Sequence, residues 1–118
     1  MANIAEPRRE IRVAEVCDIS SYHELLWCEQ LGFCGPGEGG RLVESGATRL
    51  EGDLPVNPSG GVLASNPYVA RGLVRIAEAA LQVAGAAGEH QVDGATVALA
   101  HSCHGLAAQC HTVVILGS

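Results

Sequence analysis

The segment 69–84 restricts the fold more than any other part of the sequence. Its polar residues Arg71, Arg75, Glu78 and Gln82 are spaced 4, 3 and 4 apart, which places them in one narrow stripe on a helix. Every other residue of the segment is apolar or small. A surface helix is usually apolar over a face of about 100° or somewhat more, so this one is expected to be sandwiched between two layers. A chain of 118 residues has little material to supply both layers by itself.

Short strand-like segments flank this helix. Residues 11–17 alternate partly between apolar and polar and end at the turn-prone Asp18, while residues 96–100 and 110–116 also predict strands. The unbroken apolar run 113–116 predicts a strand that is buried on both faces. Strands that alternate with helices predict an α/β fold, with a mixed, mostly parallel sheet and helices on both faces.

A second helix is delimited by its end signals. Ser21 followed by Glu24 fits a capping box, and Gly32 fits the position just after a helix that ends near Leu31. The glycine-rich segments 35–40 and 58–61 predict loops, with a short helix at 41–45. We expect one domain over residues 11–118 and a flexible N-terminus over residues 1–10.

The composition indicates which classes of partner are disfavoured and which cellular compartment the chain is expected in. The net charge is −6 and all seven cations are arginine, so no basic stripe favours nucleic acid or an anionic membrane. The first ten residues hold no apolar segment of a secretory signal, and no run of eighteen apolar residues predicts a membrane span. Five cysteines, an odd number, are then expected to be reduced thiols in the cytoplasm.

Histidine and cysteine gather near the end of the chain, at His101, Cys103, His104, Cys110 and His111. Zinc prefers these ligands, and a small zinc-binding protein is therefore one hypothesis. The spacing lacks a Cys-x-x-Cys pair, and on a strand His101 and Cys103 share a face that His104 leaves. The sequence therefore predicts no metal site as its first choice, and the alternative is buried thiols beside exposed histidines.

The order of several motifs resembles the C-terminal lobe of the thiolases, and within them the lipid-transfer-protein or sterol-carrier-protein type. The residues that carry the resemblance extend over about 11–117; they are Val13 to Asp18, Glu29 to Cys34, Gly37 to Gly40, Leu54 to Gly61, Ile76 to Glu78, Gln82, Ala87 to Gly88, Gln91 to Val92 and Ala98 to His101. The resemblance implies acyl transfer on coenzyme A thioesters by a nucleophilic cysteine, an activating histidine and a second acid/base, with no further cofactor. It also implies that the apolar helix lies between two halves of a five-layer molecule.

The resemblance assigns the family's site loops to particular positions here. The first loop, which carries the nucleophile, belongs to an N-terminal half that this sequence does not contain. The second corresponds to Cys17-Asp18-Ile19-Ser20, the third to Ser65-Asn66-Pro67, which has no histidine, and the fourth to Cys103-His104-Gly105. Candidate catalytic residues are thus Cys103, His104, His101, Asn66 and Cys17, and candidate substrate-binding residues are Asn57, Gly60, Gly61 and Gly105.

Two functions follow from the resemblance. One is the C-terminal part of an acyl-CoA acyltransferase in lipid metabolism, which needs an N-terminal thiolase half or another oligomer partner and is inactive alone. The other is a degenerate lobe that acts as a scaffold subunit in a lipid or steroid degradation complex, and the missing Gly-His-Pro histidine favours it. Asn66 can donate a hydrogen bond to a thioester oxygen but cannot act as a base near neutral pH.

Overall fold

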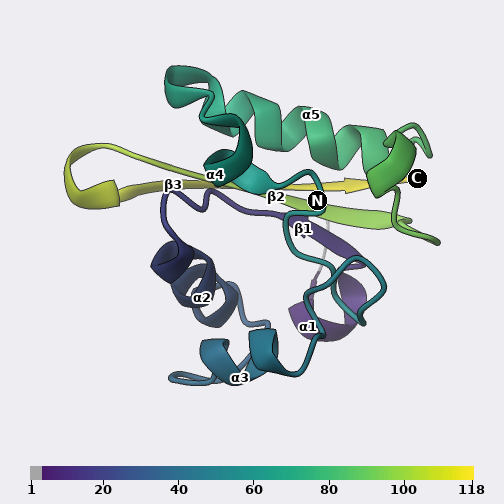
Figure 1. The fold of residues 1–118 in the computed structure, drawn as a ribbon, viewed down its shortest axis with the longest axis horizontal. Helices are drawn as coiled ribbons and strands as arrows, with labels where there is room; N and C mark the ends of the chain where they lie inside the picture. The colour runs from purple at the N-terminus through teal and green to yellow at the C-terminus, as the bar shows by residue number, and fades with distance from the viewer. Residues whose placement is uncertain (1–3) are drawn as a thin grey trace.

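A three-stranded sheet separates two groups of helices in the computed structural model, which describes residues 4–118. The strands β1 (Val13–Glu15), β2 (Val97–His104) and β3 (Cys110–Gly117) lie in the order β1-β2-β3. Helix α5 (Arg71–Val83) covers one face, and α2 (Ser21–Gln30) and α3 (Gly39–Glu44) lie on the other (Figure 1). The predicted α/β class with helices on both faces is confirmed.

The sheet is mixed. β1 runs parallel to β2, an isolated parallel bridge joins Ala14 to Val56, and β2 pairs with β3 in an antiparallel hairpin. β1 and β2 correspond to the predicted strands at 11–17 and 96–100, although β1 is shorter and β2 extends four residues further, to His104. The prediction that β3 is buried on both faces is wrong, because β3 is the edge strand and Val113 in its centre keeps 48% of its surface exposed.

Helix α2 ends as predicted but begins differently. Gly32 adopts a φ of +77° just beyond the helix, a conformation that suits glycine. Ser20 rather than Ser21 is the N-cap, and its hydroxyl lies 2.7 Å from Nδ1 of His23. The capping box is therefore wrong, because the residue three positions after the N-cap is His23, and Glu24 faces Asp18 and Asn57 instead.

Helix α5 confirms the helix expected over 69–84, and it is oriented with its polar stripe toward the sheet. Arg75 and Gln82 are each 1% exposed, whereas Leu73 is 71% exposed. A short 3₁₀ turn, Tyr68–Ala70, precedes the helix and exposes Val69 almost completely. The helix is therefore covered on one side only, and its apolar side faces outward.

Two groups of buried side chains form the core, one on each side of the sheet. The larger joins β1 and β2 to α2 through Val16, Trp27, Phe33 and Leu99. The smaller lies under α5 and consists largely of alanine and valine, including Ala79, Ala98 and Ala100. Small side chains allow α5 to approach β2 closely; a Cβ at Gly72 would lie 2.5 Å from Oγ of Ser102.

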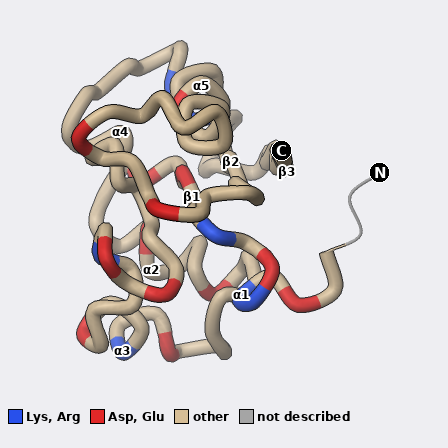
Figure 2. Tube along the Cα trace, turned by 90° about the vertical axis from the view of Figure 1, so that its right-hand side faces the viewer, with Lys and Arg blue, Asp and Glu red and all other residues tan. Residues whose placement is uncertain are grey.

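Acidic and basic residues lie mainly on α1 (Pro7–Glu10), α3 and the connecting segments, and the edge strand β3 carries none (Figure 2). The segment expected to be a flexible N-terminus thus includes α1, while its residues 1–3 lie outside the described residues. In the described part of the chain, the helices are all too short or too polar to cross a bilayer. All five cysteines fall within that part and are free thiols.

Candidate functional site

The carboxyl ends of β1 and β2 bring two of the predicted site residues together. Cys17 follows β1 and Cys103 lies near the end of β2, and their side chains are 0% and 1% exposed. Burial, the hydrogen bond to the Cys17 thiol and the proximity of that thiol raise the pKa of Cys103. Cys103 is therefore protonated near neutral pH, which suits a proton donor better than a nucleophile.

His101 lies beside this pair, on the same face of β2 as Cys103. The backbone N–H of Cys17 points to its Nδ1 at 3.5 Å, and its Nε2 lies 3.1 Å from Nδ1 of His111 on β3. Burial and the neighbouring His111 lower the pKa of His101 to about 4. Both ring nitrogens are engaged and the ring is neutral, so His101 orients the Cys17 backbone in this arrangement.

Asp18 was not among the predicted site residues, yet it connects β1 to α4 (Gly61–Ser65). Its Oδ1 accepts a hydrogen bond of 2.6 Å from the backbone N–H of Val62, and a Cβ on Gly61 would overlap its carboxylate. Gly61 also has a φ of +69°, so glycine is required there by space and by conformation. Burial raises the pKa of Asp18. The motif Cys17-Asp18 and the pair Gly60-Gly61 were the sequence signals for this contact, although they lie more than forty residues apart.

Asn57 holds the loop before α4 against β1. Its N–H donates to the carbonyl of Ala14 at 2.8 Å, and its Oδ1 accepts from the N–H of Val16 at 2.7 Å. Its φ of +52° is one of the left-handed conformations that asparagine tolerates. Asn57 is buried, and the contacts that it makes with β1 are those of a residue that positions the loop.

A buried ion pair anchors the same loop to α5. The Arg75 guanidinium lies 2.5 Å from Oε2 of Glu15, and the hydroxyl of Ser59 donates to this oxygen at 2.7 Å. The Ser59 N–H donates to Oε1 of Glu15 at 3.2 Å. Burial raises the pKa of Glu15, while the bonds from Ser59 and the charge of Arg75 act in the opposite direction. The spacing of polar residues in 69–84 predicts that Arg75 lies on a polar stripe, but no local pattern indicates Glu15 as its partner.

Asn66 ends α4 in a left-handed conformation, with a φ of +40°, and is exposed. It lines a shallow cleft of about 200 Å³ with Ile19, Val62, Leu63, Tyr68 and Arg71. The positive charge of Arg71, which lines this cleft, acts against the raised pKa of Cys103. Gly60, with a φ of +90°, is exposed where α4 begins.

The structure does not bring His104 and Gly105 into this group. His104 is exposed opposite Cys110 at the end of β2, and Gly105 begins the exposed turn to β3 with a φ of +83°. As predicted, His104 leaves the strand face that His101 and Cys103 share. Within residues 4–118, no three or more His, Cys, Asp or Glu side chains are arranged to hold a metal ion, so the zinc hypothesis has no ligand set there.

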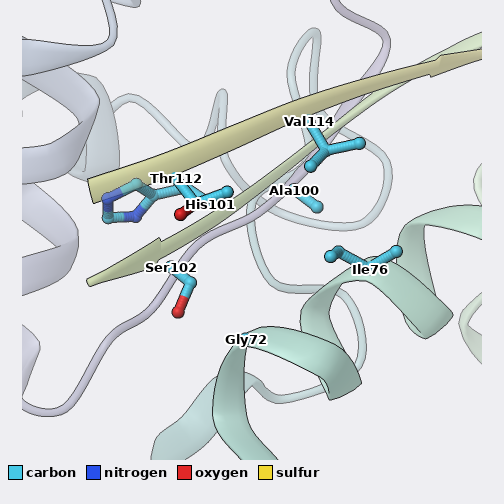
Figure 3. Close-up of a pocket in the computed structure, with 7 residues that line it drawn as sticks. All are labelled: Gly72, Ile76, Ala100, His101, Ser102, Thr112 and Val114. Carbon is cyan, nitrogen blue, oxygen red and sulfur yellow. The ribbon is translucent and has the colours of Figure 1, made fainter. Parts of the chain in front are cut away.

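The other face of the hairpin forms a second cavity, of about 180 Å³, against α5. Ser102 points from β2 toward Gly72 of α5, with Thr112 and Val114 of β3 and Ile76 of α5 around the space (Figure 3). Alternation along β2 therefore sends His101 and Cys103 to the α2 side and Ser102 to the α5 side.

Comparisons with known proteins identify the family and the fold. A family model described as thiolase C-terminal domain-like matches residues 1–118. An acetyl-CoA acetyltransferase of Methanothermobacter thermautotrophicus is 45% identical over 97 residues, which are 81% of this chain and 25% of that protein. Human sterol carrier protein 2 is 44% identical over 94 residues, 79% of this chain and 17% of that protein.

A solved structure, described as an Ltp2-ChsH2(DUF35) aldolase, superimposes with a TM-score of 0.80 and 30% identity. The superposition covers 93% of this chain and 27% of that one. The chain thus spans about a quarter or less of the length of these relatives. Since the family model extends over all 118 residues, the chain belongs to the thiolase C-terminal domain-like family.

Proposed function

We propose that this chain is the C-terminal lobe of a thiolase-type enzyme that acts on coenzyme A thioesters in lipid metabolism, and that an N-terminal half supplies the nucleophile. The observation that carries the proposal is the orientation of α5. Arg75, Glu78 and Gln82 of its polar stripe bond to β1 and the segment after the helix. Leu73, Leu81 and the preceding Val69 are exposed. A lone surface helix has the opposite arrangement. A second layer over α5 would bury this face, and the relatives, which are about three to five times as long as this chain, have the length to supply one.

In this proposal, the two thiols and the cleft beside them form one side of the substrate site. Cys103 donates a proton to the departing carbon or sulfur atom, since its raised pKa keeps it protonated. Asn66 donates its amide to the thioester oxygen from the edge of the cleft. No other cofactor is needed for this chemistry. The free thiols are in keeping with a cytoplasmic location, which is part of the proposal.

The experiment mixes the 118-residue chain with an N-terminal half taken from a related thiolase and measures cleavage of a 3-ketoacyl-CoA. We expect turnover by the mixture and none by the chain alone. The variant Leu73→Glu places a charge on the exposed side of α5 and should abolish association and turnover without unfolding the chain. Val113→Glu is the matched control, because Val113 is also exposed but lies on β3. Turnover by the isolated chain would refute the claim that the nucleophile lies elsewhere.

The scaffold function remains the second candidate because the Ser65-Asn66-Pro67 loop has no histidine. It predicts that the mixture associates but does not turn over. It also predicts that Cys103→Ala, in an assembled complex that is active through other subunits, leaves the activity unchanged.

A further inference from the structure

His111 on β3 belongs to the histidine and cysteine cluster near the end of the sequence but has no role in the proposed site, and its ring lies edge to edge with that of His101. The two nearest ring nitrogens are 3.1 Å apart, the centroids are 5.4 Å apart, and the ring planes differ by 16°. The nitrogens lie between the two ring centres and the ring planes are nearly parallel, so the two imidazoles are joined by a hydrogen bond in the plane of the rings. His111 is exposed and His101 is 2% exposed, so the pair connects solvent to the interior.

The hydrogen bonds determine which nitrogen carries each proton. The N–H of Cys17 is a donor, so Nδ1 of His101 must accept and its proton must lie on Nε2. That Nε2–H then donates to Nδ1 of His111, whose own proton lies on Nε2, toward solvent. His111 therefore fixes the tautomer in which His101 can accept from Cys17.

Trp27 completes the arrangement from α2. Its indole N–H donates to the carbonyl of Cys17 at 2.9 Å, and its ring centroid lies 5.0 Å from those of both histidines. The backbone of Cys17 is thus held through its N–H by His101 and through its carbonyl by Trp27. Asp18, the next residue, bonds to the first turn of α4.

Protonation of either imidazole breaks one of these hydrogen bonds. A proton on Nδ1 of His101 displaces the Cys17 N–H, and a proton on Nδ1 of His111 opposes the Nε2–H of His101. The ionisable groups that face the pair are His23, beside Trp27 on α2, the Cys17 thiol after β1 and Cys103, directly opposite His111 in the β2–β3 register. In the described part of the chain, no carboxylate or guanidinium forms a hydrogen bond with either ring that would compensate an added charge.

We propose that His111 is a positioning residue that acts through His101 on the Cys17 loop, and that protonation of the imidazole pair releases this loop. The inference rests on the proposed function only because the loop borders the proposed acyl-CoA site. Its test uses the chain alone and reads tautomers and amide exchange. A failed test would leave the acyltransferase proposal standing, and an inactive mixture would leave this inference standing.

The test compares the wild type with His111→Asn, His111→Val and Thr112→Val. The Oδ1 of an asparagine can replace Nδ1 as the acceptor but does not titrate, whereas valine removes the acceptor. Thr112 is the matched control, because it is the next residue of β3 and points to the other face. Imidazole ¹⁵N shifts report the tautomer of His101, and hydrogen exchange reports protection of the Cys17 amide.

At pH 7 we expect the Nε2–H tautomer of His101 in the wild type, His111→Asn and Thr112→Val. In His111→Val, the two tautomers should mix and the Cys17 amide should exchange about five- to tenfold faster, as for the loss of one hydrogen bond. Exchange rates are corrected for the intrinsic pH dependence of amide exchange. On acidification, the Cys17 amide should then lose its protection at a higher pH in the wild type than in His111→Asn. A Nδ1–H tautomer in the wild type, or equal exchange in His111→Val and Thr112→Val, would overturn the proposal.

Discussion

Replacing Arg75 by methionine removes the guanidinium from a buried ion pair and leaves Glu15 behind without its counter-charge. Glu15 is 0% exposed and Arg75 is 1% exposed, so water cannot replace the lost partner. Within residues 4–118, the remaining hydrogen bonds to the Glu15 carboxylate come from the N–H and the hydroxyl of Ser59. Breaking such a pair from one side costs about 3–5 kcal/mol, because an uncompensated charge stays buried.

The expected loss is large enough to measure by heat or urea. For a domain of this size, each kcal/mol corresponds to roughly 4 °C or more in Tm, so we expect a decrease on the order of 12–20 °C for Arg75→Met. Arg71→Met is the matched control: Arg71 begins the same helix, is half-buried and forms no ion pair within residues 4–118, and its loss should cost less than about 1 kcal/mol.

The double variant Glu15→Gln/Arg75→Met distinguishes a buried charge from lost packing. Glutamine can still accept from the Ser59 N–H but carries no charge, so the double variant should be more stable than Arg75→Met alone, by about 1–3 kcal/mol. The single variant has a further signature. Burial already raises the pKa of Glu15 in the wild type, and loss of the Arg75 charge, which lowers it, raises it further in the variant. The stability of the variant relative to the wild type should therefore increase as the pH falls through the folded-state pKa of its Glu15. If the loss of stability in the double variant equalled the sum of the losses in Glu15→Gln and Arg75→Met at every pH, the buried-charge argument would be wrong.

Two further predictions use the same unfolding assays. The pKa of His101 is about 4 in the folded chain and about 6.5 in the unfolded chain, so on acidification the unfolded chain takes up a proton first. The free energy of unfolding should therefore fall by up to about 3 kcal/mol between pH 6.5 and 4. His101→Phe should lack this part of the pH dependence of stability, and an unchanged pH dependence would contradict the assignment. Gly61→Ala should cost about 1–3 kcal/mol more than Gly37→Ala, because both glycines have a positive φ but only at Gly61 would the added Cβ overlap the Asp18 carboxylate. Equal losses would show that Asp18 gives way.

Local signals predicted the helices better than the sheet. The spacing of Arg71, Arg75 and Gln82 and the position of Gly32 fixed two helices, because periodicity and end residues act within a few turns. The edge position of β3 could not be read from its apolar run, since it depends on which strands pair across the whole chain.

In the candidate site too, residues that belong to local motifs were predicted, and contacts between distant parts of the sequence were not. Cys17, His101 and Cys103 were predicted from motifs, and the structure places them together at the ends of β1 and β2. Asp18 with Gly61 and Glu15 with Arg75 are contacts between residues 43 to 60 positions apart in the sequence, and His111 is coupled to His101 by the register of a hairpin. The Asp18 and Gly61 motifs are visible in the sequence, but nothing local indicates that these two residues, or the members of the other two pairs, lie in contact. Only the fold shows these pairings.

The polar contacts of α5 determine which side of the helix packs on the sheet and which side faces solvent. A helix with one narrow polar stripe could bury more apolar surface by turning that stripe to solvent and placing Leu73 and Leu81 on the sheet. In this chain, the Arg75 guanidinium instead binds Glu15, and the Gln82 amide group binds the carbonyl of His90 and the N–H of Val92. These contacts fix the rotation of the helix, at a cost in desolvation. The exposed apolar side is therefore built into the fold of this lobe, and the Arg75 and Leu73 variants test its two sides separately.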